Sequence, residues 1–262
     1  MSELTVLVSR DGRGVTTVTL NRPALHNAFD EALIQKLIET FESVGRDDTC
    51  RVMVLAGAGK SFSAGGDLNW MRRMAGYSDA ENLSDAHELA RLMRTLDRLP
   101  KPTIARAHGS VFAGGLGLVA CCDVAVAEQG TIFSVSEARL GLVPSVISPY
   151  LIRAIGARMA RRYFLTAERF SAAEAHRIGL VHEVVPAAEL DTKVEAIVSA
   201  LLEGGPSAQA RSKQLVAEVT DRPIEQPVIE ITARTIAEAR ASDEAREGLA
   251  AFFEKRKPRW RE

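Results

Sequence analysis

The sequence predicts an α/β fold with parallel strands, because the order strand, glycine-rich turn, helix occurs twice. The first copy runs from an apolar stretch at residues 51–56, through Ser-Phe-Ser-Ala-Gly-Gly-Asp at residues 61–67, into a helical pattern. The second runs from an apolar stretch at residues 103–107, through a turn at residues 109–117, into a small-residue helix. From about Arg153 the pattern becomes mostly helical, which predicts a helical C-terminal region.

The N-terminal third is predicted to hold a hairpin and one amphipathic helix. Residues 6–8 and 15–20 read as strands around Asp-Gly-Arg-Gly, a composition typical of a hairpin turn. Asn21-Arg22-Pro23 ends the second strand. Asp30 is placed to cap a helix whose apolar residues recur with helical spacing up to Phe41.

The central part is expected to continue with a polar connection and further helices. Residues 77–83 are polar and read as a mobile connection before a helix at residues 88–99, which Pro-Lys-Pro ends. Residues 123–127 follow the second glycine turn as a strand. Helical spacing then predicts six segments: residues 157–165, 172–178, 190–202, 207–219, 225–241 and 243–255.

Composition excludes several classes of function. The 262 residues are 46% hydrophobic, which suffices for a sizeable core, and 33 basic against 34 acidic residues give no field that would attract nucleic acid or an anionic membrane. The three cysteines fit neither a disulfide framework nor a zinc site. The sequence shows no signal peptide and no apolar run that could span a bilayer, so we expect a cytoplasmic protein.

The two glycine turns and Glu137 suggest chemistry on an activated carbonyl compound. Two tight turns can bring two free backbone N–H groups to one point, where they hold a carbonyl oxygen as it gains negative charge. A carboxylate beside that point can move a proton. The alternatives are that the glycines only permit close strand-to-helix packing, and that Glu137 is a surface carboxylate paired with Arg139. Neither turn matches a phosphate-binding loop or a complete dinucleotide fingerprint.

Six motifs then occur in one order along almost the whole chain. They are Asn21-Arg22-Pro23 with Asn27-Ala28, Ser-Ala-Gly-Gly-Asp at residues 63–67, His-Gly with Ala-Gly-Gly at residues 108–115, Cys122-Asp123, Glu137, and Phe-Glu-Lys-Arg-Lys at residues 253–257. This ordered set resembles the crotonase superfamily of enoyl-CoA hydratases and isomerases. The resemblance implies a spiral of repeated ββα units over residues 1–195, and a helical trimerisation region over residues 196–262. It also implies a homotrimer or a dimer of trimers.

The resemblance assigns roles to individual residues. The thioester oxygen of an acyl-CoA substrate would lie between the N–H groups of Gly66 and Gly114, and Glu137 would be the acid and base. CoA enters only as part of the substrate, with no prosthetic group and no metal. Four residues would contact CoA: Leu25, Ala64, Leu68 and Lys255. Lys255, from the same or a neighbouring subunit, would meet the CoA phosphates, unless it is simply a solvated charge.

The chain departs from the hydratase pattern at three positions. Gly117 stands where hydratases of this family have a first glutamate, three residues after the second oxyanion glycine. Ser145 replaces a usual glycine, and Ser136 replaces the proline before Glu137. One carboxylate is enough for double-bond isomerisation. It is also enough for syn addition of water, with Ser136, Ser145 or a backbone carbonyl holding the water.

A narrower resemblance concerns the substrate. Residues 67–74, 114–123 and 136–149 look like bacterial methylglutaconyl-CoA hydratases of leucine breakdown. We therefore expect hydration of a branched 2-enoyl-CoA, with Arg72 and Arg73 binding a second carboxylate unless they lie on a solvated helix face. The related isohexenylglutaconyl-CoA hydratases, an enoyl-CoA isomerase, hydrolysis or decarboxylation of an acyl-CoA, and a non-catalytic acyl-CoA-binding paralogue remain as alternatives.

Overall fold

A six-stranded sheet runs through the computed structural model, which describes residues 4–261. Its strands lie in the order β1 (Val6–Arg10), β2 (Val15–Leu20), β3 (Val52–Gly57), β4 (Thr103–Ala107), β6 (Val124–Glu128) and β9 (Glu183–Val185). The pair β1–β2 is antiparallel, as the predicted hairpin requires, and every other neighbouring pair is parallel. The α/β prediction is therefore confirmed.

A second, three-stranded sheet makes the repeat of the fold visible. It contains β5 (Ser110–Phe112), β7 (Ile132–Ser134) and β8 (Phe170–Ser171). Because β5 follows β4 and β7 follows β6 along the chain, each of these two repeats contributes one strand to each sheet before the next α-helix. This is the spiral of ββα units that the resemblance implied. The sequence analysis missed these short strands, since two or three residues carry no readable alternation.

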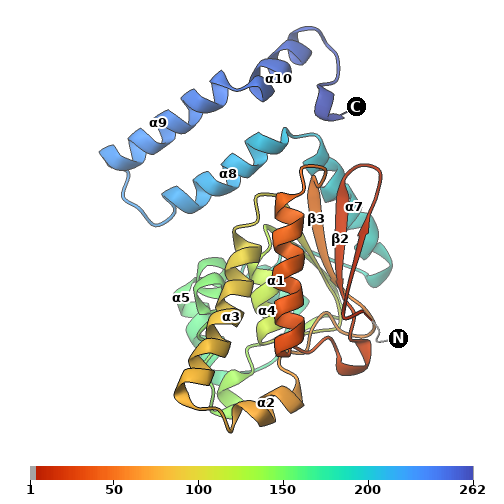
Figure 1. Ribbon diagram of the computed structural model, residues 1–262, viewed down its shortest axis with the longest axis vertical. Helices are drawn as coiled ribbons and strands as arrows, with labels where there is room; N and C mark the ends of the chain where they lie inside the picture. Colours follow the sequence, from red (N-terminus) through yellow and green to blue (C-terminus); the bar gives the residue numbers. More distant parts are fainter. Residues whose placement is uncertain (1–3, 262) are drawn as a thin grey trace.

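Helices cover the large sheet on both faces (Figure 1). On one face, α1 (Glu31–Arg46), α3 (Asp79–Asp97) and α4 (Gly114–Cys121) pack over inward residues such as Met53 and Leu55. On the other, α7 (Leu190–Leu202) packs over Val52 and Val54. The alternation along β3 follows from the pleat of a strand, which sends successive side chains to opposite faces.

The expected mobile connection before α3 is wrong. Residues 79–97 form one continuous helix, which begins nine residues before the expected residue 88. Ser78 caps it, accepting a hydrogen bond from the N–H of Glu81, while the Glu81 carboxylate accepts one from the N–H of Ser78. This capping box satisfies backbone donors that would otherwise lack partners at the helix start, so the polar residues here are helical.

The remaining helices lie between the sheets' strands and in the C-terminal region. They are α2 (Leu68–Met74), α5 (Ser148–Thr166), α6 (Ala172–Arg177), α8 (Pro206–Val219), α9 (Gln226–Ala241) and α10 (Asp243–Phe253). Short 3-10 helices occupy Pro23–Leu25 (η1), Glu137–Leu140 (η2), Ala187–Glu189 (η3) and Arg259–Arg261 (η4). Within residues 4–261, none of the helices is long and apolar enough to cross a bilayer.

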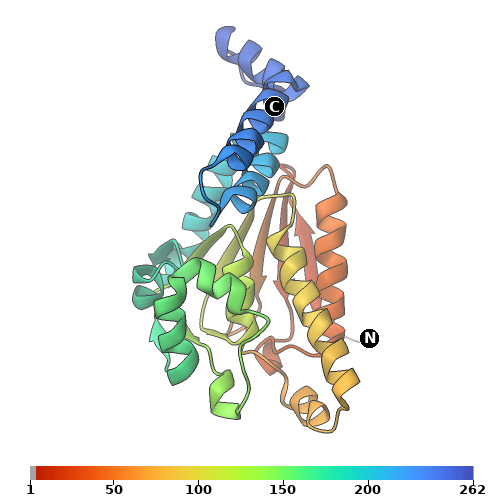
Figure 2. The same cartoon turned by 90° about the vertical axis from the view of Figure 1, so that its left-hand side faces the viewer.

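Helices α8, α9 and α10 extend from one end of the sheet, and α2 lies at the other end (Figures 1 and 2). The expected division after residue 195 falls inside α7, which packs on the sheet along its length. The chain leaves the sheet only after Leu202, before Pro206 begins α8. The division into two domains stays a prediction.

Candidate active site

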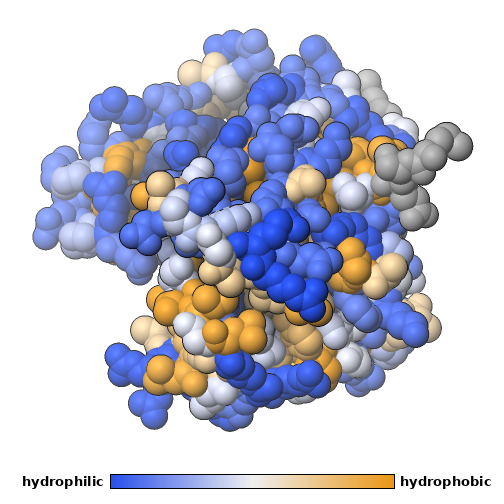
Figure 3. All heavy atoms as spheres, turned by 60° about the horizontal axis from the view of Figure 1, so that its bottom comes forward, coloured by the Kyte–Doolittle hydropathy of each residue, from blue (hydrophilic) through white to orange (hydrophobic). Residues whose placement is uncertain are grey.

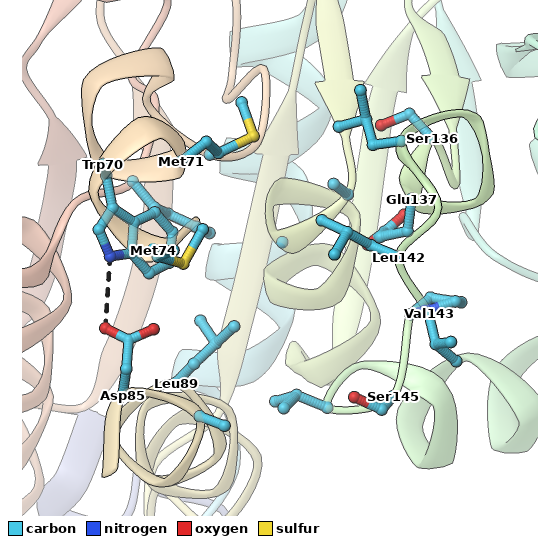
Figure 4. Close-up of a pocket in the computed structure, with 18 of the residues that line it drawn as sticks. Trp70, Met71, Met74, Asp85, Leu89, Ser136, Glu137, Leu142, Val143 and Ser145 are labelled. Atoms are coloured by element: carbon cyan, nitrogen blue, oxygen red, sulfur yellow. Dashed lines mark hydrogen bonds between the residues drawn. The ribbon is translucent and has the colours of Figure 1, made fainter. Parts of the chain in front are cut away.

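A cavity of about 760 Å³ lies at the end of the molecule that carries α2. Its walls come from both glycine turns, from α2 and α3, and from the segment 136–147 (Figure 4). Most of the lining side chains are apolar: Phe29, Leu68, Trp70, Met71, Met74, Leu89, Leu140, Leu142, Val143, Val146 and Ile147. Apolar residues also gather on the surface at this end (Figure 3). The cavity is therefore suited to an apolar chain with a few polar groups.

The first glycine turn is held by a short parallel pairing with residue 29. The N–H of Phe29 donates to the carbonyl of Gly65, and the N–H of Asp67 donates to the carbonyl of Phe29, each at 2.7 Å. This bridge fixes Gly66 between two hydrogen-bonded neighbours. Gly65 adopts a φ of +94°, a conformation that favours glycine.

Arg22 and Asn27 of the N-terminal motif hold the first glycine turn in place. The Asn27 amide is fully buried and donates to the carbonyls of Ala58 and Ser61 at 2.9 and 2.8 Å. The Arg22 guanidinium pairs with Asp30 at 2.9 Å and with Asp67 at 3.2 Å. The Asn-Arg-Pro motif thus positions the glycine turn and does not touch the cavity itself.

The second glycine turn delivers Gly114 to the start of α4. Ala113 before it has a φ of +47°, and its N–H donates to the carbonyl of Ser134 at 3.0 Å. A Cβ at Gly114 would overlap the ring of Phe29, so only glycine fits. The first N–H groups of a helix have no partner within the helix and carry its positive dipole end.

Gly66 and Gly114 both line the cavity. Among residues 4–261 no acceptor is hydrogen-bonded to either N–H. Two unused donors from two fixed turns can hold an oxygen that becomes negative, a contribution of about 3–4 kcal/mol per donor in known cases.

Glu137 begins η2 and faces the same cavity (Figure 4). Its Oε2 is buried and has no hydrogen-bond partner among the described residues. Burial raises the pKa of this carboxyl above its usual value, and the backbone N–H of Glu137 offsets only part of that rise. Within residues 4–261 no ion pair joins it to Arg139, so the alternative of a salt-bridged surface carboxylate is not what the structure shows. A carboxyl poised in this way can take and return a proton.

Comparison with known proteins shows the family to which the chain belongs. The family model for enoyl-CoA hydratase/isomerase matches residues 10–262. The chain belongs to the enoyl-CoA hydratase/isomerase family. A crystal structure of an enoyl-CoA hydratase from Shewanella pealeana has 45% identity and a TM-score of 0.95, over 98% of this chain and 96% of that one.

Two relatives show the range of activities in the family. The 2,3-dehydroadipyl-CoA hydratase of Escherichia coli is 32% identical over 98% of both chains. The trans-2-decenoyl-[acyl-carrier-protein] isomerase of Streptococcus mutans is 28% identical over 94% of both chains. The chain is thus an enzyme of the crotonase superfamily. The catalytic roles of Gly66, Gly114 and Glu137 stay predictions.

The position of the missing first glutamate is closed by another side chain. A Cβ at Gly117 would overlap Ile147 Cγ2 and would lie 3.2 Å from Met93 Cε. Gly117 itself is buried and does not line the cavity, whereas Ile147 does. Ser136 and Ser145 both line it, and their role in the acyl pocket stays a prediction (Figure 4). The first glutamate is therefore replaced by an apolar wall.

The four expected CoA contacts are divided between two ends of the molecule. Ala64 and Leu68 line the cavity, and Leu68 is 68% exposed at its rim. Leu25 is exposed in η1, next to His26, whose carbonyl accepts a hydrogen bond from the N–H of Ala64. Lys255 follows α10, which lies at the opposite end of the molecule from α2 (Figure 1).

Arg72 and Arg73 lie on the exposed side of α2, outside the cavity lining. Arg72 hydrogen-bonds the Asn69 side chain at 2.9 Å, and Arg73 forms an ion pair with Glu31 at 2.6 Å. The structure does not bring either guanidinium to the acyl pocket. Their role in binding a carboxylate stays a prediction.

Sequence reasoning missed Asp85, a second carboxyl in the cavity wall. It lies on α3, and its Oδ1 accepts a hydrogen bond from Trp70 Nε1 at 3.3 Å (Figure 4). Burial raises the pKa of this carboxyl, the Trp70 hydrogen bond lowers it, and the nearby Glu31 charge raises it further. The capping signal Ser-x-x-Glu at residues 78–81 could have placed Asp85 on a helix, but not in the pocket.

Proposed function

We propose that the protein hydrates a 2-enoyl-CoA thioester, with Glu137 as its single acid and base. The observation that carries the proposal is the buried Glu137 carboxyl facing the same cavity as two unused N–H groups. Glu137 removes a proton from water as the water oxygen bonds to C3 of the enoyl group. The electron pair moves to the thioester oxygen, where Gly66 and Gly114 hold the enolate. Glu137 then returns the proton to C2, so that one water is added.

This route needs no second carboxylate, because the proton that leaves water is the one that reaches C2. Ser136 and Ser145 line the cavity and offer hydroxyl groups that can orient the water. Ile147 excludes solvent from the side where the first glutamate of other hydratases would stand.

The specific substrate that we propose to test first is 3-methylglutaconyl-CoA, which hydration converts to 3-hydroxy-3-methylglutaryl-CoA. The sequence motifs support this choice, which would place the enzyme in leucine catabolism. The Escherichia coli relative is named for a dehydroadipyl-CoA substrate, whose acyl group also has a second carboxyl.

Double-bond isomerisation is the second candidate, because one carboxylate can also move a proton along an acyl chain. The Streptococcus mutans relative is named as an isomerase. Incubation with 3-methylglutaconyl-CoA, crotonyl-CoA and a 3-enoyl-CoA separates the two. Loss of the enoyl-thioester absorbance with a mass gain of one water supports hydration. A gain of that absorbance from the 3-enoyl-CoA, without hydration of any substrate, would mean that the enzyme is an isomerase and not a hydratase. Binding of the acyl-CoA esters without turnover would mean that the protein only binds acyl-CoA.

A further inference from the structure

We propose that Asp85, held by Trp70, determines which acyl groups the enzyme accepts. Its carboxyl group interacts with the distal end of the acyl chain and disfavours a negative charge there. The inference rests on the proposed acyl-CoA function, and it assigns the acyl end of the pocket. Asp85 acts on specificity and takes no part in the proton transfer by Glu137.

The first step is the direction of the cavity. Gly66, Gly114 and Glu137 all line the cavity, so in the proposed reaction the thioester oxygen and the reacting carbons lie beside them. Beyond that point the cavity continues between Met74 and Leu89 on one side and Leu142 and Val143 on the other (Figure 4). An acyl chain extending from the thioester therefore runs toward the wall that Asp85 and Trp70 form.

The second step is the geometry of the Asp85 side chain. Trp70 is 5% exposed, and its Nε1 donates to Asp85 Oδ1 at 3.3 Å, which fixes the carboxyl against the indole. The other carboxyl oxygen points to the interior of the cavity (Figure 4). Among the described residues no side chain donates a hydrogen bond to that oxygen, so it is available to a bound acyl group.

The third step is the charge around Asp85. The lining residues, all within the described part of the chain, include no lysine, arginine or histidine. The only other acid in the lining is Glu137, on the opposite wall. Glu31, on the neighbouring helix α1, is paired with Arg73 and Tyr77, and Glu88, one turn further on α3, lies near Arg91. An acyl carboxylate placed here meets a second carboxyl and no cation.

Two carboxylates that meet in this pocket repel each other, because no cation lines it, and one shared proton removes the repulsion. An acyl group with a distal carboxylate therefore binds together with a proton, whereas a neutral acyl group of the same shape binds without one. Its affinity relative to the neutral group should fall as the pH rises, by up to about tenfold per pH unit in the limit. The proposed substrate 3-methylglutaconyl-CoA carries such a carboxylate, so we expect it to bind with a proton and to bind less tightly at high pH.

Unreactive analogues test this without depending on turnover. Isovaleryl-CoA and 3-methylglutaryl-CoA share the branched acyl skeleton and differ by the distal carboxylate. Calorimetry between pH 6 and 8.5 gives the ratio of their affinities for the wild-type enzyme, Asp85→Asn and Glu88→Gln. Asparagine keeps an oxygen for Trp70, and Glu88→Gln removes an equal charge from the same helix outside the pocket.

We expect the wild-type and Glu88→Gln ratios to move against 3-methylglutaryl-CoA as the pH rises. We expect Asp85→Asn to shift the ratio toward it by about tenfold at pH 8 and to flatten the dependence. The proposal would be overturned if the affinity ratio of Asp85→Asn changed with pH as it does in the wild type. It would also be overturned if Asp85→Asn weakened the binding of both ligands equally. Failure of hydration with an intact effect on the affinity ratio would overturn only the proposed function.

Discussion

Glu137 combines burial, a raised pKa and a free oxygen in one side chain. Glu137→Gln keeps the shape and removes the ability to transfer a proton. We expect kcat for hydration to fall by about 10²–10⁴-fold, the usual contribution of general acid–base catalysis, while acyl-CoA affinity changes little. Stopped-flow absorbance and calorimetry measure the two quantities.

The pH profile adds a second readout for the same residue. Glu137 must be ionised to take a proton from water, so kcat/KM for a neutral enoyl-CoA should rise with pH through a pKa above the ordinary value for glutamate. Turnover by Glu137→Gln at the wild-type rate, or a wild-type profile without this acidic limb, would assign the chemistry to another group.

The Ile147 side chain occupies the space that a side chain at position 117 would need. Gly117→Glu alone should lower the free energy of unfolding by about 1–3 kcal/mol, since its Cβ overlaps Ile147. Ile147→Ala alone should also destabilise the fold, because it opens a cavity. The double variant should lose less free energy of unfolding than the two single variants lose together. Urea denaturation of the wild type, both single variants and the double variant measures these free energies. Additive effects would mean that Ile147 does not occupy this space.

The site residues that could be predicted from the sequence are those that lie in short local motifs. Gly66, Gly114 and Glu137 lie in short motifs, and the structure places all three on one cavity. Asp85 and Ile147 could not be predicted in the same way, because each reaches the cavity through packing of helices that are far apart in the sequence. Arg72 and Arg73 follow the first turn closely, yet the helix turns both of them outward.

Among the elements, α3 decides the shape of the acyl pocket. Its first two turns carry Asn82 and Asp85, which line the cavity, and its start depends on the capping box between Ser78 and Glu81. The apolar periodicity in the sequence becomes clear only further along, so a reading from periodicity alone begins the helix late. The capping residues are a physical signal that such a reading leaves unused.

The capping box makes a testable link between helix stability and substrate binding. Ser78→Ala removes one cap and should cost about 1 kcal/mol of local stability. We expect faster amide hydrogen exchange at residues 79–85 and a severalfold higher KM, with kcat nearly unchanged. Ser84→Ala, at an exposed position on the same helix, is the matched control. Equal exchange rates in both variants would show that the cap does not stabilise this segment.

At the scale of the whole molecule, the C-terminal helices leave large apolar side chains exposed. Phe252 and Phe253 are 76% and 75% exposed, and Ile224 is 85% exposed. Residues of this size are usually covered in a stable protein, which supports the proposed trimer or dimer of trimers. Lys255 follows α10, which lies at the opposite end of the molecule from α2 and the cavity (Figure 1). We therefore expect any contact of Lys255 with CoA to come from a neighbouring subunit.

Mixed assemblies test that contact directly. Lys255→Ala should raise KM for acyl-CoA severalfold by removing a charge that meets the CoA phosphates, and Glu137→Gln should be inactive. The two variants are co-expressed with different tags, and assemblies with both tags are purified and sized by native mass spectrometry. In these assemblies every competent Glu137 belongs to a Lys255→Ala chain, so a KM returning toward the wild-type value requires lysine from the neighbour. A KM that stays at the Lys255→Ala value would remove this role from Lys255, and a monomeric mass would remove the trimer itself.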